Sequence, residues 1–119
     1  MNINIKGTNL DLTEPIKAYA TGKILAISKF LHKSGDEAVT IIELERTTDH
    51  HNKGEVYRTV INLTVSGKLY RAEVTNSDLY ASIDLAKDEL ARELIGDKNR
   101  KETLFRRGAR LAKRILRRN

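Results

Sequence analysis

Segments with the hydrophobic period of a strand and segments with that of a helix follow one another along the first 96 residues of the chain. Apolar Ile3 and Ile5 alternate with polar residues, which predicts a strand over residues 2–6. A helical period follows from Thr13 to about residue 31, and Thr13 is the expected N-cap, with an acid and a proline in the first turn. The predicted apolar face of this helix consists of Ile16, Tyr19, Ala20, Ile24, Ile27, Phe30 and Leu31.

Three more strands are predicted over residues 39–46, 56–65 and 68–75. The first is rich in β-branched residues, and its pattern leaves open which face points inward. The other two flank Ser66-Gly67, a tight-turn signal, and are expected to form a hairpin. Their predicted inward residues are Tyr57, Thr59, Ile61, Leu63 and Val65 on one strand, and Tyr70, Ala72 and Val74 on the other.

A second amphipathic helix follows, capped by Asn76 or Ser77 with Asp78 in its first turn, and Gly96 is the expected C′ residue. Its apolar stripe consists of Leu79, Ile83, Ala86, Leu90 and Leu94. The element order β-α-β-β-β-α predicts an α+β two-layer sandwich, in which both helices cover one face of a four-stranded sheet. We assign residues 1–96 to this domain.

The remaining residues, 97–119, form a basic tail. They contain ten Lys and Arg against two acids, a net charge of +8, whereas the first 96 residues sum to −2. On a helical wheel, one arc of about 160° holds the apolar residues Leu104, Phe105, Ala109, Leu111, Ala112, Ile115 and Leu116. The opposite side holds Arg106, Arg107, Arg110, Lys113, Arg114, Arg117 and Arg118. We expect an amphipathic helix over residues 103–117, preceded by a basic linker over 97–102 that carries Lys98, Arg100 and Lys101.

Composition and motifs narrow the function classes. Without Cys there is no disulfide, thiol chemistry or Cys-based zinc site. The chain has no nucleophile elbow, P-loop or dinucleotide motif, so we expect neither an enzyme nor a cofactor. No apolar run has the length of a signal peptide core or a membrane span, which leads us to expect a cytoplasmic protein.

Two clusters of chemically capable residues have simpler interpretations. Asp49, His50 and His51 lie in a polar stretch with only His32 as a further histidine, so we expect a polar loop and no metal site. The second helix carries the acids Asp84, Asp88, Glu89 and Glu93, for which we expect a solvated surface and no acid–base pair.

The segregated charge of the tail favours contact with RNA or DNA phosphates. A membrane-surface helix also has basic and apolar sides, but the tail lacks Trp and has Phe105 as its one aromatic residue. The pattern is also compatible with docking on a protein through the apolar side, and with a purely solubilising role. We expect a monomeric body, with any further contacts made by the tail.

Several segments resemble the ribosome hibernation promoting factor family, also called ribosome-associated inhibitor or ribosomal subunit interface proteins. The most specific is Asp-Leu-Tyr-Ala-Ser-Ile-Asp at residues 78–84, preceded by Leu-Tyr-Arg-Ala-Glu at 69–73. Residues 3–7, 11–13 and 54–58, with Tyr19 and Lys23, are similar too. The resemblance covers residues 1 to about 101 and indicates a short form of the family, with the basic segment in place of the dimerisation domain of long members.

The resemblance implies a fold akin to double-stranded RNA-binding domains. It also implies binding in the mRNA channel of the small ribosomal subunit near the decoding centre, where tRNA and mRNA sites are blocked and translation is inhibited under stress. Carried over by position, the residues facing ribosomal RNA are Lys23, Lys29, Lys87, Arg92, Lys98, Arg100 and Lys101. A general structured-RNA-binding module without ribosome preference is the alternative function.

Overall fold

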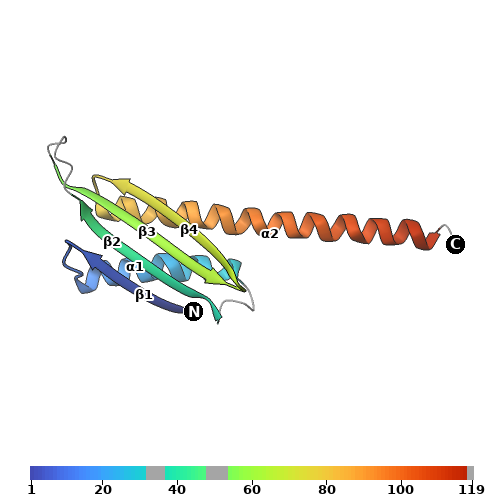
Figure 1. Cartoon of the computed structure of the whole chain (residues 1–119), viewed down its shortest axis with the longest axis horizontal. Helices are drawn as coiled ribbons and strands as arrows, with labels where there is room; N and C mark the ends of the chain where they lie inside the picture. Colours follow the sequence, from blue (N-terminus) through green and yellow to red (C-terminus); the bar gives the residue numbers. More distant parts are fainter. Residues whose placement is uncertain (32–36, 48–53, 118–119) are drawn as a thin grey trace.

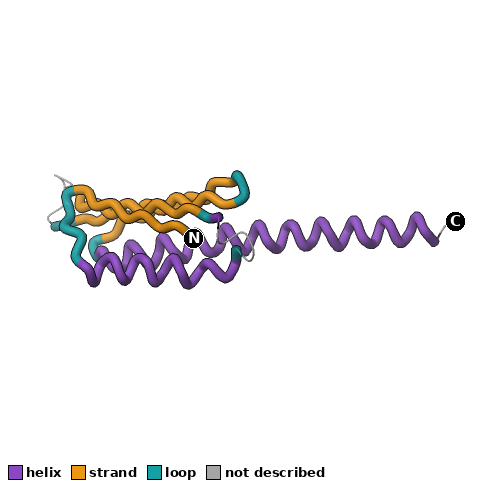
Figure 2. Tube along the Cα trace, turned by 90° about the horizontal axis from the view of Figure 1, so that it is seen from below, coloured by secondary structure: helices purple, strands orange, loops and turns teal. Residues whose placement is uncertain are grey.

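A four-stranded sheet is covered on one face by two helices (Figures 1 and 2). The computed structural model describes residues 1–31, 37–47 and 54–117. The elements are β1 (Asn2–Thr8), α1 (Glu14–Ile27), the 3₁₀ helix η1 (Ser28–Phe30), β2 (Val39–Thr47), β3 (Val56–Val65), β4 (Lys68–Asn76) and α2 (Leu79–Arg117). The predicted α+β two-layer sandwich is therefore confirmed.

The sheet has the order β1-β2-β3-β4, in which β1 runs parallel to β2 and the other pairs are antiparallel. Helix α1 makes the crossover between the two parallel strands, as parallel pairs require. The predicted hairpin joins β3 to β4 through Ser66 and Gly67, whose φ angles of 51° and 75° are those of a type I′ turn.

The core lies between the sheet and the helices. The predicted inward faces of β3, β4 and both helices are confirmed, because their apolar residues are buried or pack against the buried cluster. On β2, whose inward face the sequence left open, Thr40, Ile42 and Leu44 are buried, whereas Val39 and Ile41 are exposed on the outer face. The parallel register of β1 with β2 aligns Ile5 with Ile42, so both strands contribute to the same core.

The beginnings of the helices agree only in part with the prediction. Thr13 is the N-cap of α1, but its side chain makes no capping hydrogen bond, and its carbonyl accepts from Lys17 N–H at 3.1 Å. For α2, the predicted caps Asn76 and Ser77 are wrong. Asp78 occupies the cap position, where its Oδ1 accepts from Tyr80 N–H at 3.0 Å, and Asn76 Oδ1 accepts from Asp78 N–H at 3.0 Å.

The predicted end of the second helix is also wrong, because α2 continues without a break through Gly96 to Arg117. Residues 97–102 are thus helical and form no linker. A glycine costs only about 1 kcal/mol in a helix interior, and strong helix formers follow it. Beyond the body, residues 98–117, which we call the projecting segment, extend the helix and give the molecule extents of 71 × 31 × 19 Å (Figure 1).

Candidate nucleic-acid interface

The outer face of the sheet neutralises its own charge. Arg58 lies between two acids, with its Nη1 3.2 Å from Glu45 and its Nε 2.5 Å from Glu73. Arg71 Nη2 contacts the second of these carboxylates at 2.9 Å. Because Arg58 and Arg71 are paired with carboxylates, the part of this face around them is a poor surface for phosphates.

On the helical face, Lys23 lies at the seam between α1 and α2. Tyr19 OH donates to Asp84 Oδ1 at 2.7 Å, and Lys23 Nζ is 3.2 Å from the same oxygen and 5.1 Å from the Tyr19 ring centre. The tyrosine hydrogen bond, helped by the ammonium, holds the pKa of Asp84 below its ordinary value. In turn, hydrogen bonding to this carboxylate raises the pKa of Lys23. The lysine is therefore firmly positioned but partly neutralised.

Asp84 thus departs from its predicted role as a freely solvated acid, because it is half-buried and joins the two helices. Asp88 is exposed and is 3.2 Å from Lys87 Nζ. Glu89 and Glu93 are exposed, as expected. These four acids of α2 therefore differ in their surroundings, since Asp84 is half-buried between the helices and the other three are exposed.

The other predicted cations of the body are scattered over the helical face. Lys29 lies over the ring of Phe30, with its Nζ 5.2 Å from the ring centre. Lys87 is engaged by its neighbour Asp88, whereas Arg92 is exposed and has no ion pair within the described part of the chain. The structure therefore brings these residues to one face without gathering them into a single cluster.

The junction between body and projecting segment is organised by Asp97, which sequence reasoning left unassigned. Its carboxylate is buried and accepts hydrogen bonds from Tyr70 OH at 2.6 Å and from Lys68 and Arg100. The Lys68 and Tyr70 hydrogen bonds lower the pKa of Asp97 to about 2. This cluster ties α2 to the start of β4, and Arg100, a predicted RNA contact, is part of it.

One sequence signal pointed to this cluster. Asp97 takes the next position of the apolar stripe after Leu94, at the three- or four-residue spacing of that stripe. A carboxylate there must find partners, because an unpaired buried charge is very costly.

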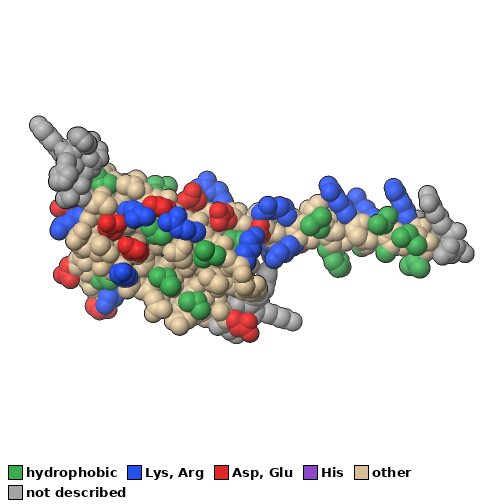
Figure 3. Space-filling view, viewed as in Figure 1, with side chains coloured by type: hydrophobic (Ala, Val, Ile, Leu, Met, Phe, Trp, Pro, Cys, Tyr) green, Lys and Arg blue, Asp and Glu red, His purple; other side chains and the backbone are tan. Residues whose placement is uncertain are grey.

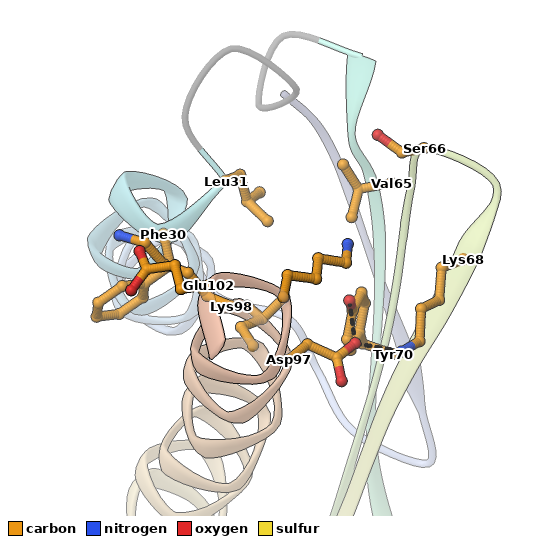
Figure 4. Close-up of a pocket in the computed structure, with 11 residues that line it drawn as sticks. Phe30, Leu31, Val65, Ser66, Lys68, Tyr70, Asp97, Lys98 and Glu102 are labelled. Carbon is orange, nitrogen blue, oxygen red and sulfur yellow. Dashed lines mark hydrogen bonds and ion pairs between the residues drawn. The ribbon is translucent and has the colours of Figure 1, made fainter. Parts of the chain in front are cut away.

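A hollow of about 270 Å³ opens beside the junction, as Figure 4 shows. Phe30, Leu31 and Val65 are among its apolar lining residues, and Figure 4 shows the side chain of Lys98 reaching from α2 into the hollow, which Lys101 also lines. The two predicted basic residues Lys98 and Lys101 therefore border an apolar space at the start of the projecting segment.

Most of the cations that have no ion pair among the described residues lie on the projecting segment. Every residue from 99 to 116 is exposed, and Figure 3 shows basic side chains standing out along it beside apolar ones. Among the described residues, no ion pair engages Arg106, Arg107, Arg110, Lys113 or Arg114. The side chain of Arg117, and Arg118 as a whole, lie outside the described residues.

The described part of the chain contains no group of His, Cys, Asp or Glu arranged to hold a metal ion. The predicted polar loop with Asp49, His50 and His51, and also His32, lie outside the described residues. Within the described ranges, no helix combines the length and hydropathy needed to cross a bilayer.

Comparison with known proteins agrees with this architecture. Residues 3–102 match the model of the family described as sigma 54 modulation protein / S30EA ribosomal protein. The chain is 33% identical over 94 residues to the ribosome hibernation promotion factor of Lactococcus lactis subsp. cremoris, covering 79% of this chain but 48% of that protein. It is 26% identical over 100 residues to the ribosome hibernation promoting factor of Escherichia coli K12, covering 84% of this chain and 96% of that protein.

A solved structure is similar as well. The Thermus thermophilus Protein Y N-terminal domain superposes with a TM-score of 0.68 and 28% identity, covering 79% of this chain and 96% of that one. The chain spans about half the length of the Lactococcus relative and nearly all of the Escherichia one. With the family model covering most of its length, the chain belongs to the sigma 54 modulation protein / S30EA ribosomal protein family.

Proposed function

We propose that this chain is a ribosome hibernation factor, which binds the small ribosomal subunit in the mRNA channel near the decoding region. There it blocks the tRNA and mRNA sites and inhibits translation. Relatives named ribosome hibernation promotion factor support the ribosome as the partner. The free cations of α2 support RNA as the surface that is bound.

The observation that carries the proposal is the charge placement along α2. Its exposed cations begin at Arg92 on the body and continue to Arg114 on the projecting segment. At about 1.5 Å per residue, this is a rod of roughly 33 Å. Such a rod makes phosphate contacts along an RNA groove, where recognition follows shape and backbone more than base edges.

The predicted RNA contacts divide into two sets in this proposal. Lys23, Lys29, Lys87 and Arg92 orient the body on ribosomal RNA. The projecting segment adds contacts by Lys98, Lys101, Arg106, Arg107, Arg110, Lys113, Arg114 and Arg117, and Arg118 directly after it adds one more. Arg100 stays bound to Asp97 and contributes a weakened field.

Co-sedimentation of the full chain with purified small subunits, in the presence of excess competitor, tests the proposal. A factor that recognises the decoding region stays bound when excess duplex RNA is added, and it lowers the yield of in vitro translation. Displacement of the chain from small subunits by the duplex RNA would instead identify a general structured-RNA-binding module. Binding that survives competition while leaving translation unchanged would place the site elsewhere on the subunit.

A further inference from the structure

The apolar side of the projecting segment continues the buried stripe of α2. The stripe passes from Leu90 and Leu94 through Asp97 and Lys101 to Leu104, Gly108, Leu111 and Ile115, always at a spacing of three or four residues. Leu90 is fully buried, whereas Leu104, Leu111 and Ile115 are 65%, 59% and 58% exposed. The side of the helix that packs on the sheet thus runs on into solvent without a cover.

This uncovered surface is larger than the stripe alone. Phe105 and Leu116 flank it and are 78% and 74% exposed. We call Leu104, Phe105, Leu111, Ile115 and Leu116 the apolar ridge. Contiguous exposed apolar surface of this kind marks an interaction site, because single scattered apolar residues are normal but a row of five is not.

The hollow at the junction lies where this stripe leaves the body. It is walled by Phe30, Leu31 and Val65 and reaches Lys101 and Glu102 on the helix (Figure 4). The hollow and the ridge lie one after the other along α2, with Lys101 between them, and we call the two together the notch. A segment lying along the ridge has a place for its end in the hollow.

The charges around the ridge indicate the chemistry of its occupant. On a helical wheel of residues 104–117, the basic residues nearest to its two edges are Lys113, about 60° from Leu116, and Arg107, about 40° from Leu111. A second ridge from another copy would add its own basic residues to this rim, which disfavours pairing of two tails. A partner whose apolar surface is flanked by carboxylates is therefore complementary in charge to the ridge and its basic edges.

The shape of the body disfavours a bilayer as the occupant. The sheet lies on one side of α2 (Figure 2), and the stripe faces it, since Leu90 and Leu94 are buried in the core. A flat membrane surface would therefore meet the sheet before it reaches Leu104. A protein segment narrow enough to enter the notch has no such obstacle.

We propose that the apolar ridge docks on a ribosomal protein, through an apolar segment flanked by carboxylates, while the opposite side of the same helix binds ribosomal RNA. The helix thus lies between protein and RNA, and each of its two sides has a different partner. This inference rests on the proposed function, since it takes the ribosome as the target. It explains the segregation of the two sides, which phosphate binding alone leaves without a cause.

Site-specific photo-crosslinking of the full chain to purified small subunits tests the proposal. A crosslinking residue is placed at Leu104 or Ile115 on the ridge, and at Arg106 or Arg110 as matched positions on the basic side. The ridge positions are expected to give adducts with one ribosomal protein, and the basic positions adducts with RNA. RNA adducts from both sides, adducts with a second copy, or no ridge adduct in a co-sedimenting complex would each overturn it.

A binding series gives an independent measurement. The variant L104A/L111A/I115A removes apolar surface while keeping strong helix formers, and is expected to weaken binding by about tenfold or more at every salt concentration without changing the salt slope. The matched variant R106Q/R110Q/R114Q is expected to flatten the slope. If the wild type binds small subunits and the alanine variant binds equally well, this inference is refuted and the proposed function stands. If wild type does not bind, the proposed function fails.

Flotation of the full chain with vesicles of phosphatidylcholine and phosphatidylglycerol tests whether a lipid bilayer binds the apolar ridge. No flotation is expected. Flotation that the alanine variant abolishes would assign the ridge to lipid and overturn the proposal.

Discussion

Under the proposed function, replacing the unpaired cations of the projecting segment should flatten the salt dependence of binding to small subunits. The variant carries Gln at Arg106, Arg107, Arg110, Lys113 and Arg114, which are exposed and unpaired among the described residues. Gln keeps a helix propensity close to that of Lys and Arg, so the helix itself should persist, as far-ultraviolet circular dichroism would verify.

The magnitude follows from the arrangement of these cations. On a helical wheel the five share one arc of about 120°, with Arg106, Arg110 and Lys113 towards one end and Arg107 and Arg114 towards the other, so an open RNA surface contacts about three and an enclosing groove all five. With about 0.7–0.9 counterions released per phosphate, the slope of log K against log salt changes by roughly 2 to 4.5. Between 50 and 200 mM salt, wild type then loses about 20- to 500-fold more affinity than the variant.

The assay is a titration of labelled protein with purified small subunits at four or more salt concentrations. The control variant K6Q/R71Q removes two cations from the outer face of the sheet, where Arg71 is already paired with Glu73, and should keep the wild-type slope. Equal slopes for wild type and the five-Gln variant would refute the assignment of these residues to phosphate contacts.

Three further predictions concern stability. Leu90→Ala empties a fully buried position and should lower the free energy of unfolding in urea by about 2–5 kcal/mol; a loss below ~1 kcal/mol would contradict the packing described. Asp97→Asn should destabilise the protein at pH 7. Because folding lowers the pKa of Asp97 from 3.8 to about 2, its stabilisation is complete above about pH 5 and is lost as the pH falls toward 2, so the variant should show a shallower acid transition. Gly96→Ala meets no atom within 4 Å and should raise the thermal midpoint, adding about 0.4–1 kcal/mol; destabilisation would indicate that α2 ends near Gly96.

Local patterns were sufficient for most of the fold. The alternation in β3 and the stripe from Leu79 to Leu94 each required burial on one side, and both are buried as predicted. The Ser66-Gly67 turn followed from its residues, since few dipeptides accept two positive φ angles. The same patterns left β2 undecided, because apolar side chains occur on both of its faces and only pairing with β1 and β3 selects one.

Gly96 led to a wrong prediction of where the second helix ends. A C′ glycine and an interior glycine look alike in sequence, because both follow an apolar stripe. The difference lies in the residues beyond, where Asp97 is held by Lys68 and Tyr70 from β4, some 30 positions earlier. Such a long-range contact has no local signature except a carboxylate on an apolar stripe.

The candidate interface was likewise found only in part. Counting charge along the chain located the cations of the projecting segment, and the helical wheel separated them from its apolar side. The pairing of Lys23 with Asp84 depends on how the two helices meet, and the pairing of Arg100 with Asp97 requires the helix to continue past Gly96, so the structure changed which cations are free.

By itself, the sequence determined the element order, the inward faces of most elements and the two-sided character of the basic tail, because each depends on hydrophobic period and local charge. Only the tertiary structure decided that the tail is the straight continuation of α2, with its apolar side turned the same way as the core. The physical reason is that helical phase carries through Gly96 only when the backbone is unbroken, and the Asp97 cluster, assembled from β4 and α2, holds it at that point.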